Sequence, residues 1–146
     1  MRYHCTLIDK KQTVDSHSWE TAIILTRIYP QCSKKLLEYA LVHDCGESVT
    51  GDVPAPIKKR YPYLKDEYDK IETMSLNNLG VETPNFSKEE KLALKWADYL
   101  SGLYFTTRRM RAGDMEAAII RDNWLSYLGS LPYLNEEALT IMEELS

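Results

Sequence analysis

Two histidines and two aspartates could hold one divalent metal ion: His17, His43, Asp44 and Asp98. The first histidine stands near the start of an apolar helical pattern, and the His43-Asp44 pair stands near the end of the next one. Asp98 lies within a long pattern that is apolar around much of a helix. An ionised carboxylate is costly in such surroundings unless a cation or a hydrogen-bond donor pairs with it. A metal ion bound by all four side chains would meet that requirement.

Two imidazoles and two carboxylates suit several divalent ions and do not suit a structural zinc site built from thiolates. We therefore expect one divalent ion, and the ligand types leave Co²⁺, Mn²⁺, Zn²⁺, Fe²⁺ and Mg²⁺ open. Such an ion polarises a phosphoryl group and lowers the pKa of a bound water molecule. The ligand set predicts a metal-dependent hydrolase whose reaction needs no covalent intermediate.

Two predicted helices must bring the histidines together. The first covers residues 15–30, beginning at the N-cap candidates Asp15 and Ser16, and the second covers residues 33–47. Their short connection favours antiparallel neighbours, so the start of the first helix lies level with the end of the second. Asp44 then follows His43 with a rotation of about 100° on the second helix. The apolar residues of the first helix recur at helical spacing: Trp19, Ile23, Ile24 and Ile28.

The rest of the chain also predicts helices and no convincing strand. Apolar spacing indicates helices over residues 64–79, 87–113, 115–125 and 135–145. Ser87 and Glu90 form a capping box at the start of the long helix, whereas glycines and prolines predict an irregular loop over residues 50–62. We expect an all-α helical bundle that forms one domain over residues 1–146.

Composition limits the partners and the compartment. The net charge of −4 provides no basic field for a nucleic-acid polymer. Cys5, Cys32 and Cys45 are odd in number and lack C-x-x-C spacing, which indicates free thiols in a reducing compartment. We find no secretory signal and no apolar run long enough to span a membrane. We therefore expect a cytoplasmic protein without a nucleic-acid or membrane partner.

Other acidic and basic side chains are candidates for the same site. Glu47 follows His43 by four residues, which places it on the same face of an α-helix, where it could transfer a proton. Asp52 is a second acid, in the loop rich in glycine and proline. Cys45 is more typical of a packed core thiol than of a nucleophile, because no base partner is visible. On spacing alone, Glu47 and Asp52 fit a solvated surface as well as a site.

The pattern of His17, the His43-Asp44 dipeptide and the distant Asp98 resembles the HD-domain phosphohydrolase superfamily. The run HDCGESVTGDVPAPIK, which ends at Lys58, resembles its 5'-deoxynucleotidase branch more specifically. A lone HD dipeptide is a weak signal, and the extended string is a strong one. The resemblance implies the HD-domain helical bundle and assigns the metal to the two histidines and two aspartates.

The same resemblance implies roles for residues around the metal. Glu47 would assist the attacking water, and Asp52 would hydrogen-bond near the sugar or the leaving oxygen. Arg2 and Lys58 would contact phosphate, and Tyr3 would lie against the sugar. The branch carries tryptophan where this chain has Tyr3, so selectivity between deoxyribose and ribose stays open.

The resemblance, which covers residues 2–105, implies metal-dependent hydrolysis of deoxynucleoside 5'-phosphates, with release of phosphate from a monophosphate favoured. Compact relatives of similar length, of a phage type, include HD enzymes that act on triphosphates such as dATP. A deoxynucleoside triphosphate triphosphohydrolase that releases tripolyphosphate is therefore one alternative. A catalytically silent nucleotide-binding HD module is another. The superfamily commonly forms dimers or larger assemblies, and we expect a homo-oligomer whose interface draws on Trp124, Tyr127 and Tyr133.

Overall fold

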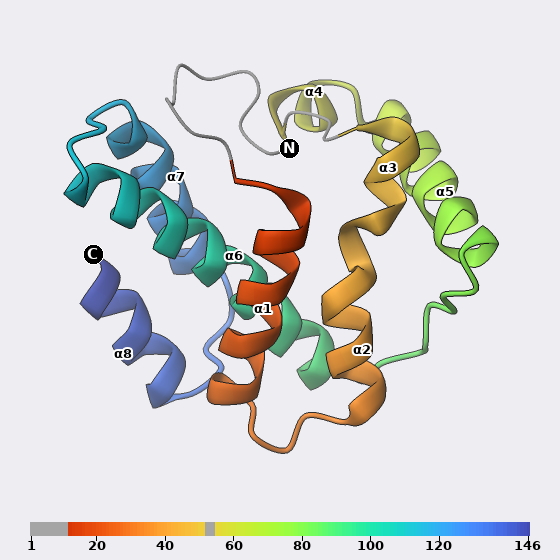
Figure 1. Cartoon of the computed structure of the whole chain (residues 1–146), viewed down its shortest axis with the longest axis horizontal. Coiled ribbons are helices and arrows are strands. Elements are labelled where there is room, and N and C mark those ends of the chain that lie inside the picture. The colour runs from red at the N-terminus through yellow and green to blue at the C-terminus, as the bar shows by residue number, and fades with distance from the viewer. Residues whose placement is uncertain (1–11, 52–54) are drawn as a thin grey trace.

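The computed structural model shows a bundle of helices (Figure 1) and describes residues 12–51 and 55–146. Within these ranges every regular element is helical: α1 (Val14–Ile28), α2 (Lys34–Val42), the 3-10 helix η1 (His43–Gly46), α3 (Glu47–Thr50), α4 (Ala55–Arg60), α5 (Pro62–Asn78), α6 (Lys88–Arg111), α7 (Ala117–Gly129) and α8 (Glu136–Leu145). The predicted all-α fold is confirmed. No helix in the described ranges is long and apolar enough to cross a lipid bilayer.

The first two helices run side by side in opposite directions, as Figure 1 shows. The side chain of Thr13 caps α1 by accepting a hydrogen bond from the backbone N–H of Ser16, so the predicted cap at Asp15 or Ser16 was two or three residues late. Ser33 caps α2 in the same way, as its position in the sequence suggests. The antiparallel pairing expected from the short connection is confirmed.

The second helix changes its winding at the HD dipeptide. We predicted one α-helix to about residue 47, but α2 ends at Val42 and η1 begins at His43. A Cβ atom on Gly46 would lie 2.8 Å from the backbone oxygen of Glu72, so η1 passes very close to the backbone of α5. In a 3-10 helix Asp44 follows His43 by about 120°, instead of the 100° of an α-helix.

The segment predicted as an irregular loop is largely helical. Gly51, with φ of +70°, ends α3, and α4 then covers Ala55–Arg60 before α5 begins at Pro62. The prediction was wrong because proline is compatible with the first turn of a helix, where its missing N–H would have no helical acceptor. Pro56 and Pro62 accordingly lie in the first turns of α4 and α5.

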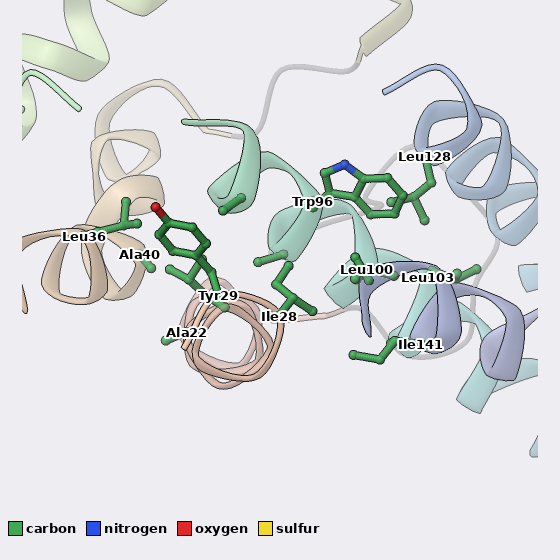
Figure 2. Packing of buried hydrophobic residues seen from close by; sticks show 14 of the residues in the cluster. Ala22, Ile28, Tyr29, Leu36, Ala40, Trp96, Leu100, Leu103, Leu128 and Ile141 are labelled. Carbon is green, nitrogen blue, oxygen red and sulfur yellow. The ribbon is translucent and has the colours of Figure 1, made fainter. Parts of the chain in front are cut away.

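The long helix α6 is the centre of the bundle. It packs most extensively against α1 and α7, and the predicted capping box of Ser87 and Glu90 opens it. Its buried Trp96 lies near Leu128 of α7 (Figure 2) and donates a hydrogen bond from Nε1 to the carbonyl of Pro132. The core in Figure 2 is shared by α1, α2, α6, α7 and α8: its fully buried large apolar side chains are Leu25, Ile28, Leu36, Trp96, Leu100, Leu103 and Leu128.

Two expectations about exposed aromatic and apolar residues were wrong. Trp19 and Ile23, whose apolar helical spacing was used to predict the first helix, are 61% and 52% exposed and do not belong to its buried face. The opposite occurs at Trp124, expected at an interface, which is 9% exposed and packs against Gly102 of α6. Tyr127 and Tyr133 are exposed. The buried face of α1 is partly polar, and an apolar pattern cannot reveal such a face.

Because α6 and α7 approach closely at Gly102, adding one methyl group there should reduce the stability of the protein. A Cβ atom at Gly102 would lie 2.3 Å from Cε2 of Trp124. We expect Gly102→Ala to lower the free energy of unfolding by about 1–3 kcal/mol, because the indole must move. Gly129→Ala is the matched control, since a Cβ there meets no atom within 4 Å. Urea unfolding measures both variants, and equal effects would contradict the packing argument.

Candidate metal centre

One imidazole of the candidate site projects from the first turns of α1. His17 is fully buried, and its Nε2 atom lies 2.7 Å from Oδ1 of Asp98 on α6. The packing of α1 against α6 therefore joins two side chains that are 81 positions apart in the sequence. Asp98 keeps partial access to solvent, so the contact lies at the wall of the bundle rather than at its centre.

The second imidazole and carboxylate come from η1. Nε2 of His43 lies 3.2 Å from Oδ1 of Asp44 and 4.0 Å from Oδ1 of Asp98. Oδ2 of Asp44 lies 3.5 Å from Nε2 of His17. One ligand atom each from His17, His43 and Asp44 lie within 4.8 Å of one another. The structure thus brings together the four residues that the sequence predicted as ligands.

The hydrogen bonding of His43 tests whether this cluster suits a metal ion. Its Nδ1 lies 2.7 Å from the carbonyl oxygen of Ala40, which can only accept a hydrogen bond. Nδ1 of His43 therefore carries the proton, and the lone pair of its Nε2 atom points toward the carboxylates. This Nε2 atom is buried and has no hydrogen-bond partner among the described residues. An orphaned imidazole nitrogen beside two carboxylates is the donor set that a divalent cation requires.

A cavity of about 370 Å³ opens on the cluster. Its lining combines aromatic, acidic and basic side chains: Tyr39, His43, Asp44, Glu72, Thr83, Pro84, Phe86, Lys91, Leu94, Lys95 and Asp98. A second hollow of about 690 Å³ adjoins it, sharing Tyr39, Pro84 and Phe86. The rings of Tyr39 and Phe86 are 5.4 Å apart, and both residues line the two spaces. The two lysines of this lining provide positive charge that suits an anionic group.

The sequence contained a signal for three of these lining residues that we did not use. Lys91 and Lys95 precede Asp98 by seven and three positions, which places all three on one face of α6. Tyr39 precedes His43 by four positions on α2, and the two rings are 6.4 Å apart. Helical spacing counted backward from the ligands would have found them.

The remaining predicted site residues have different outcomes. Glu47 begins α3, with a partly buried side chain, and does not line the cavity. Lys58 also lies outside the lining, with Nζ 4.0 Å from Oε1 of Glu72. Arg2, Tyr3 and Asp52 fall outside the described residues.

Glu72 adds an unpredicted carboxylate to the wall of the cavity. Burial raises its pKa above the ordinary value, and the nearby Lys58 ammonium opposes this rise only in part. The hydroxyl of Thr50 donates a hydrogen bond of 3.4 Å to Oε1 of Glu72. In the protein without metal, Glu72 thus resists ionisation beside the cluster.

Comparison with known proteins agrees with this arrangement. A family model described as 5'-deoxynucleotidase YfbR-like matches residues 1–135. The chain belongs to this family. Its membership confirms the resemblance to the 5'-deoxynucleotidase branch of the HD superfamily, and it extends the resemblance beyond residue 105 through α7, up to residue 135.

Curated relatives of this YfbR-like chain carry the same description. Proteins named 5'-deoxynucleotidase from Yersinia pestis (strain Pestoides F) and Yersinia pseudotuberculosis serotype O:1b (strain IP 31758) are each 31% identical to it over 98 residues. The match covers 58% of this chain and 50% of each relative. The chain spans about half the length of the curated relatives it matches.

The raised pKa of Glu72 predicts a pH-dependent effect on the stability of this family member. The native state holds the Glu72 proton more tightly than the unfolded state, for which the ordinary value is 4.5. Stability from this group is therefore present below that pH and lost as the pH rises through the native pKa. Glutamine does not ionise, so the free energy of unfolding of Glu72→Gln should increase relative to the unmodified protein over the same rise.

Chemical denaturation of the metal-free protein at a series of pH values measures this difference. Glu67→Gln, on the exposed part of α5, is the matched control for removing one negative charge from the helix. A difference between Glu72→Gln and the unmodified protein that stays constant from acid to neutral pH would contradict the assignment.

Proposed function

We propose that this chain is a metal-dependent phosphohydrolase that removes phosphate from deoxynucleoside 5'-monophosphates. The observation that carries the proposal is the convergence of the Nε2 atoms of two histidines with two aspartate carboxylates beside a cavity that contains lysines. Membership of the YfbR-like family, and relatives named 5'-deoxynucleotidase, support the choice of substrate class.

The proposed cofactor is one divalent ion held by the two histidines and two aspartates. Bound there, such an ion would polarise the phosphoryl group and lower the pKa of a water molecule. The protein contributes ligands that are already oriented, because His43 is fixed through the carbonyl of Ala40 and His17 is buried between α1 and α6. The mixed nitrogen and oxygen ligands leave Co²⁺, Mn²⁺, Zn²⁺, Fe²⁺ and Mg²⁺ as candidates.

Substrate binding follows from the lining of the cavity. Lys91 and Lys95 extend from the same face of α6 as Asp98, so their ammonium groups can neutralise the phosphate next to the metal ligands. Tyr39 and Phe86 offer apolar faces on which the sugar or base can pack. The adjoining hollow beyond these two rings provides space for the rest of the nucleoside.

In the proposed reaction the oxygen of water bonds to phosphorus, and the bond from phosphorus to the 5'-oxygen breaks. Glu47 takes a proton from the attacking water and releases it to solvent, and the 5'-oxygen leaves as a hydroxyl after taking a proton from solvent. Its position directly after η1 keeps Glu47 adjacent in the chain to the His43–Gly46 turn. Arg2, Tyr3, Asp52 and Lys58 keep the substrate-contacting roles that the family resemblance implies.

Product analysis tests the substrate class. Incubation with Mn²⁺ or Co²⁺ should convert deoxynucleoside 5'-monophosphates to nucleoside and orthophosphate, and a chelator should stop the reaction. Chromatography separates these products from those of a parallel panel of triphosphates. Tripolyphosphate from the triphosphates, without turnover of monophosphates, would replace this proposal with a triphosphohydrolase. No product with any of the five metals would contradict both enzymes.

Two carboxylate variants test the proposed division of roles. Glu47→Ala should lower kcat by about 10²- to 10⁴-fold while metal affinity persists, because a general base is lost. Asp98→Ala should weaken Mn²⁺ binding as well as activity, because a ligand is lost. Asp122→Ala, at an exposed position of α7, is the control for the second change and should leave both unchanged. Full activity of Glu47→Ala would remove this residue from the reaction.

A further inference from the structure

Three buried polar side chains lie behind His17, on the side of its ring that faces away from the metal cluster. Nδ1 of His17 lies 3.0 Å from Oγ of Ser101, and this Oγ lies 3.2 Å from Oε2 of Glu20. The side-chain amide of Gln12 donates a 2.9 Å hydrogen bond to the same Oε2 atom. Ser101, Gln12 and Glu20 are only 0%, 1% and 8% exposed. None of them lines the cavity at the cluster.

The chemistry of these groups gives the chain of hydrogen bonds one direction. A carboxylate accepts hydrogen bonds and has none to donate, whereas a serine hydroxyl has a single hydrogen. The hydroxyl hydrogen of Ser101 is therefore directed to Glu20. Its oxygen is then left to accept the hydrogen bond from Nδ1–H of His17. With a proton held on Nδ1, Nε2 is the nitrogen left to bind the metal. Nε2 lies 2.7 Å from Oδ1 of Asp98 and 3.5 Å from Oδ2 of Asp44, and a bound ion would take the place of the hydrogen that Nε2 otherwise shares with Asp98.

The two histidines of the cluster are thus held by different kinds of partner. His43 donates from Nδ1 to a neutral backbone carbonyl, that of Ala40. His17 donates to a hydroxyl that is itself bonded to a carboxylate. Negative charge on the outer side of an imidazole increases the basicity of the nitrogen that binds the metal. Glu20 therefore acts on only one of the two imidazoles.

The burial of Glu20 also needs a balancing charge. A buried carboxylate is costly unless it is paired and hydrogen-bonded. No lysine or arginine of the described ranges forms an ion pair with Glu20, whose partners there are the neutral groups of Gln12, Ser16 and Ser101. Along the chain of hydrogen bonds from Glu20, the nearest positive charge would be the divalent ion bound at the cluster, on the far side of His17.

We infer that Glu20, acting through Ser101, is a positioning residue that fixes the tautomer of His17 and strengthens metal binding at the cluster. The inference rests on the proposed function, because it assumes that the cluster holds a divalent ion. From the sequence, Glu20 is only an acidic residue in the first turns of a helix, where acidic residues are common. The inference gives it a specific role.

The test measures Mn²⁺ affinity of the full chain directly, from the EPR signal of free Mn²⁺. Glu20→Gln keeps the shape but adds donor hydrogens, so the hydroxyl of Ser101 can turn toward Nδ1 of His17 and favour the wrong tautomer. We expect this variant to bind Mn²⁺ about 10- to 100-fold more weakly. Ser101→Ala should give a similar loss. The double variant should bind Mn²⁺ no more weakly than the weaker-binding single variant, because both changes break the same chain of hydrogen bonds.

A matched control separates this role from packing. Thr106→Val also removes a fully buried hydroxyl from α6, whose partners among the described residues are the carbonyls of Gly102 and Leu103 in its own helix. Its Mn²⁺ affinity should equal that of the unmodified protein. Melting temperatures of the metal-free variants show that each is folded. In the Co²⁺-loaded protein, the shifted ring N–H proton of His17 should exchange with water faster in Glu20→Gln, as NMR detects.

The outcomes distinguish this inference from the proposed function. An unmodified chain that binds neither Mn²⁺ nor Co²⁺ would overturn the metal-dependent function itself. Metal binding by the unmodified chain, with Glu20→Gln and Ser101→Ala both within twofold of its affinity, would overturn the role of Glu20 alone. A loss of affinity that Thr106→Val shares, in step with lower melting temperatures, would assign the network to packing and also overturn that role.

Discussion

The contact between His17 and Asp98 requires α1 and α6 to lie close together over several turns. Ser101, which faces α1 through its bonds to His17 and Glu20, shares a face of α6 with the buried Ala97 and Ala93, four and eight positions earlier. A row of small side chains lets a neighbouring helix approach closely. The cluster therefore depends on residues with no chemistry of their own, whose small size sets the separation of the helices that carry His17 and Asp98.

Helix α1 buries different kinds of side chain at its two ends. Toward its C-terminal end α1 buries Leu25 and Ile28, which belong to the apolar core. Toward its N-terminal end it buries His17, Glu20 and Thr21 instead. Desolvated apolar surface holds the helices together at one end, so the polar groups at the other end can be oriented for binding. This division explains why α1 exposes Trp19 while it buries a carboxylate.

The sequence was sufficient to predict features that depend on local patterns. The capping box at Ser87, the antiparallel start of the bundle and the meeting of His17 with His43 and Asp44 follow from spacing and chain reversal, whereas Asp98 was placed with them by the apolar pattern around it and by the family resemblance. Features set by distant contacts were not predictable. The 3-10 turn at His43 accompanies the close passage of Gly46 over α5, and the network behind His17 joins residues 12, 20 and 101. Each of those residues alone is ordinary, and only the fold brings them together.

Three residues within little more than one turn of α6 each contact another part of the bundle. Asp98 lies against the two histidines of the cluster, Ser101 contacts His17 from behind, and Gly102 accommodates the indole of Trp124. Inserting or deleting one residue in this turn would rotate the two sides by about 100° relative to each other. All three contacts could not then be kept, even if every side chain were retained. Changes of chain length must therefore be confined to the connections between helices, whereas this turn can vary only by substitution.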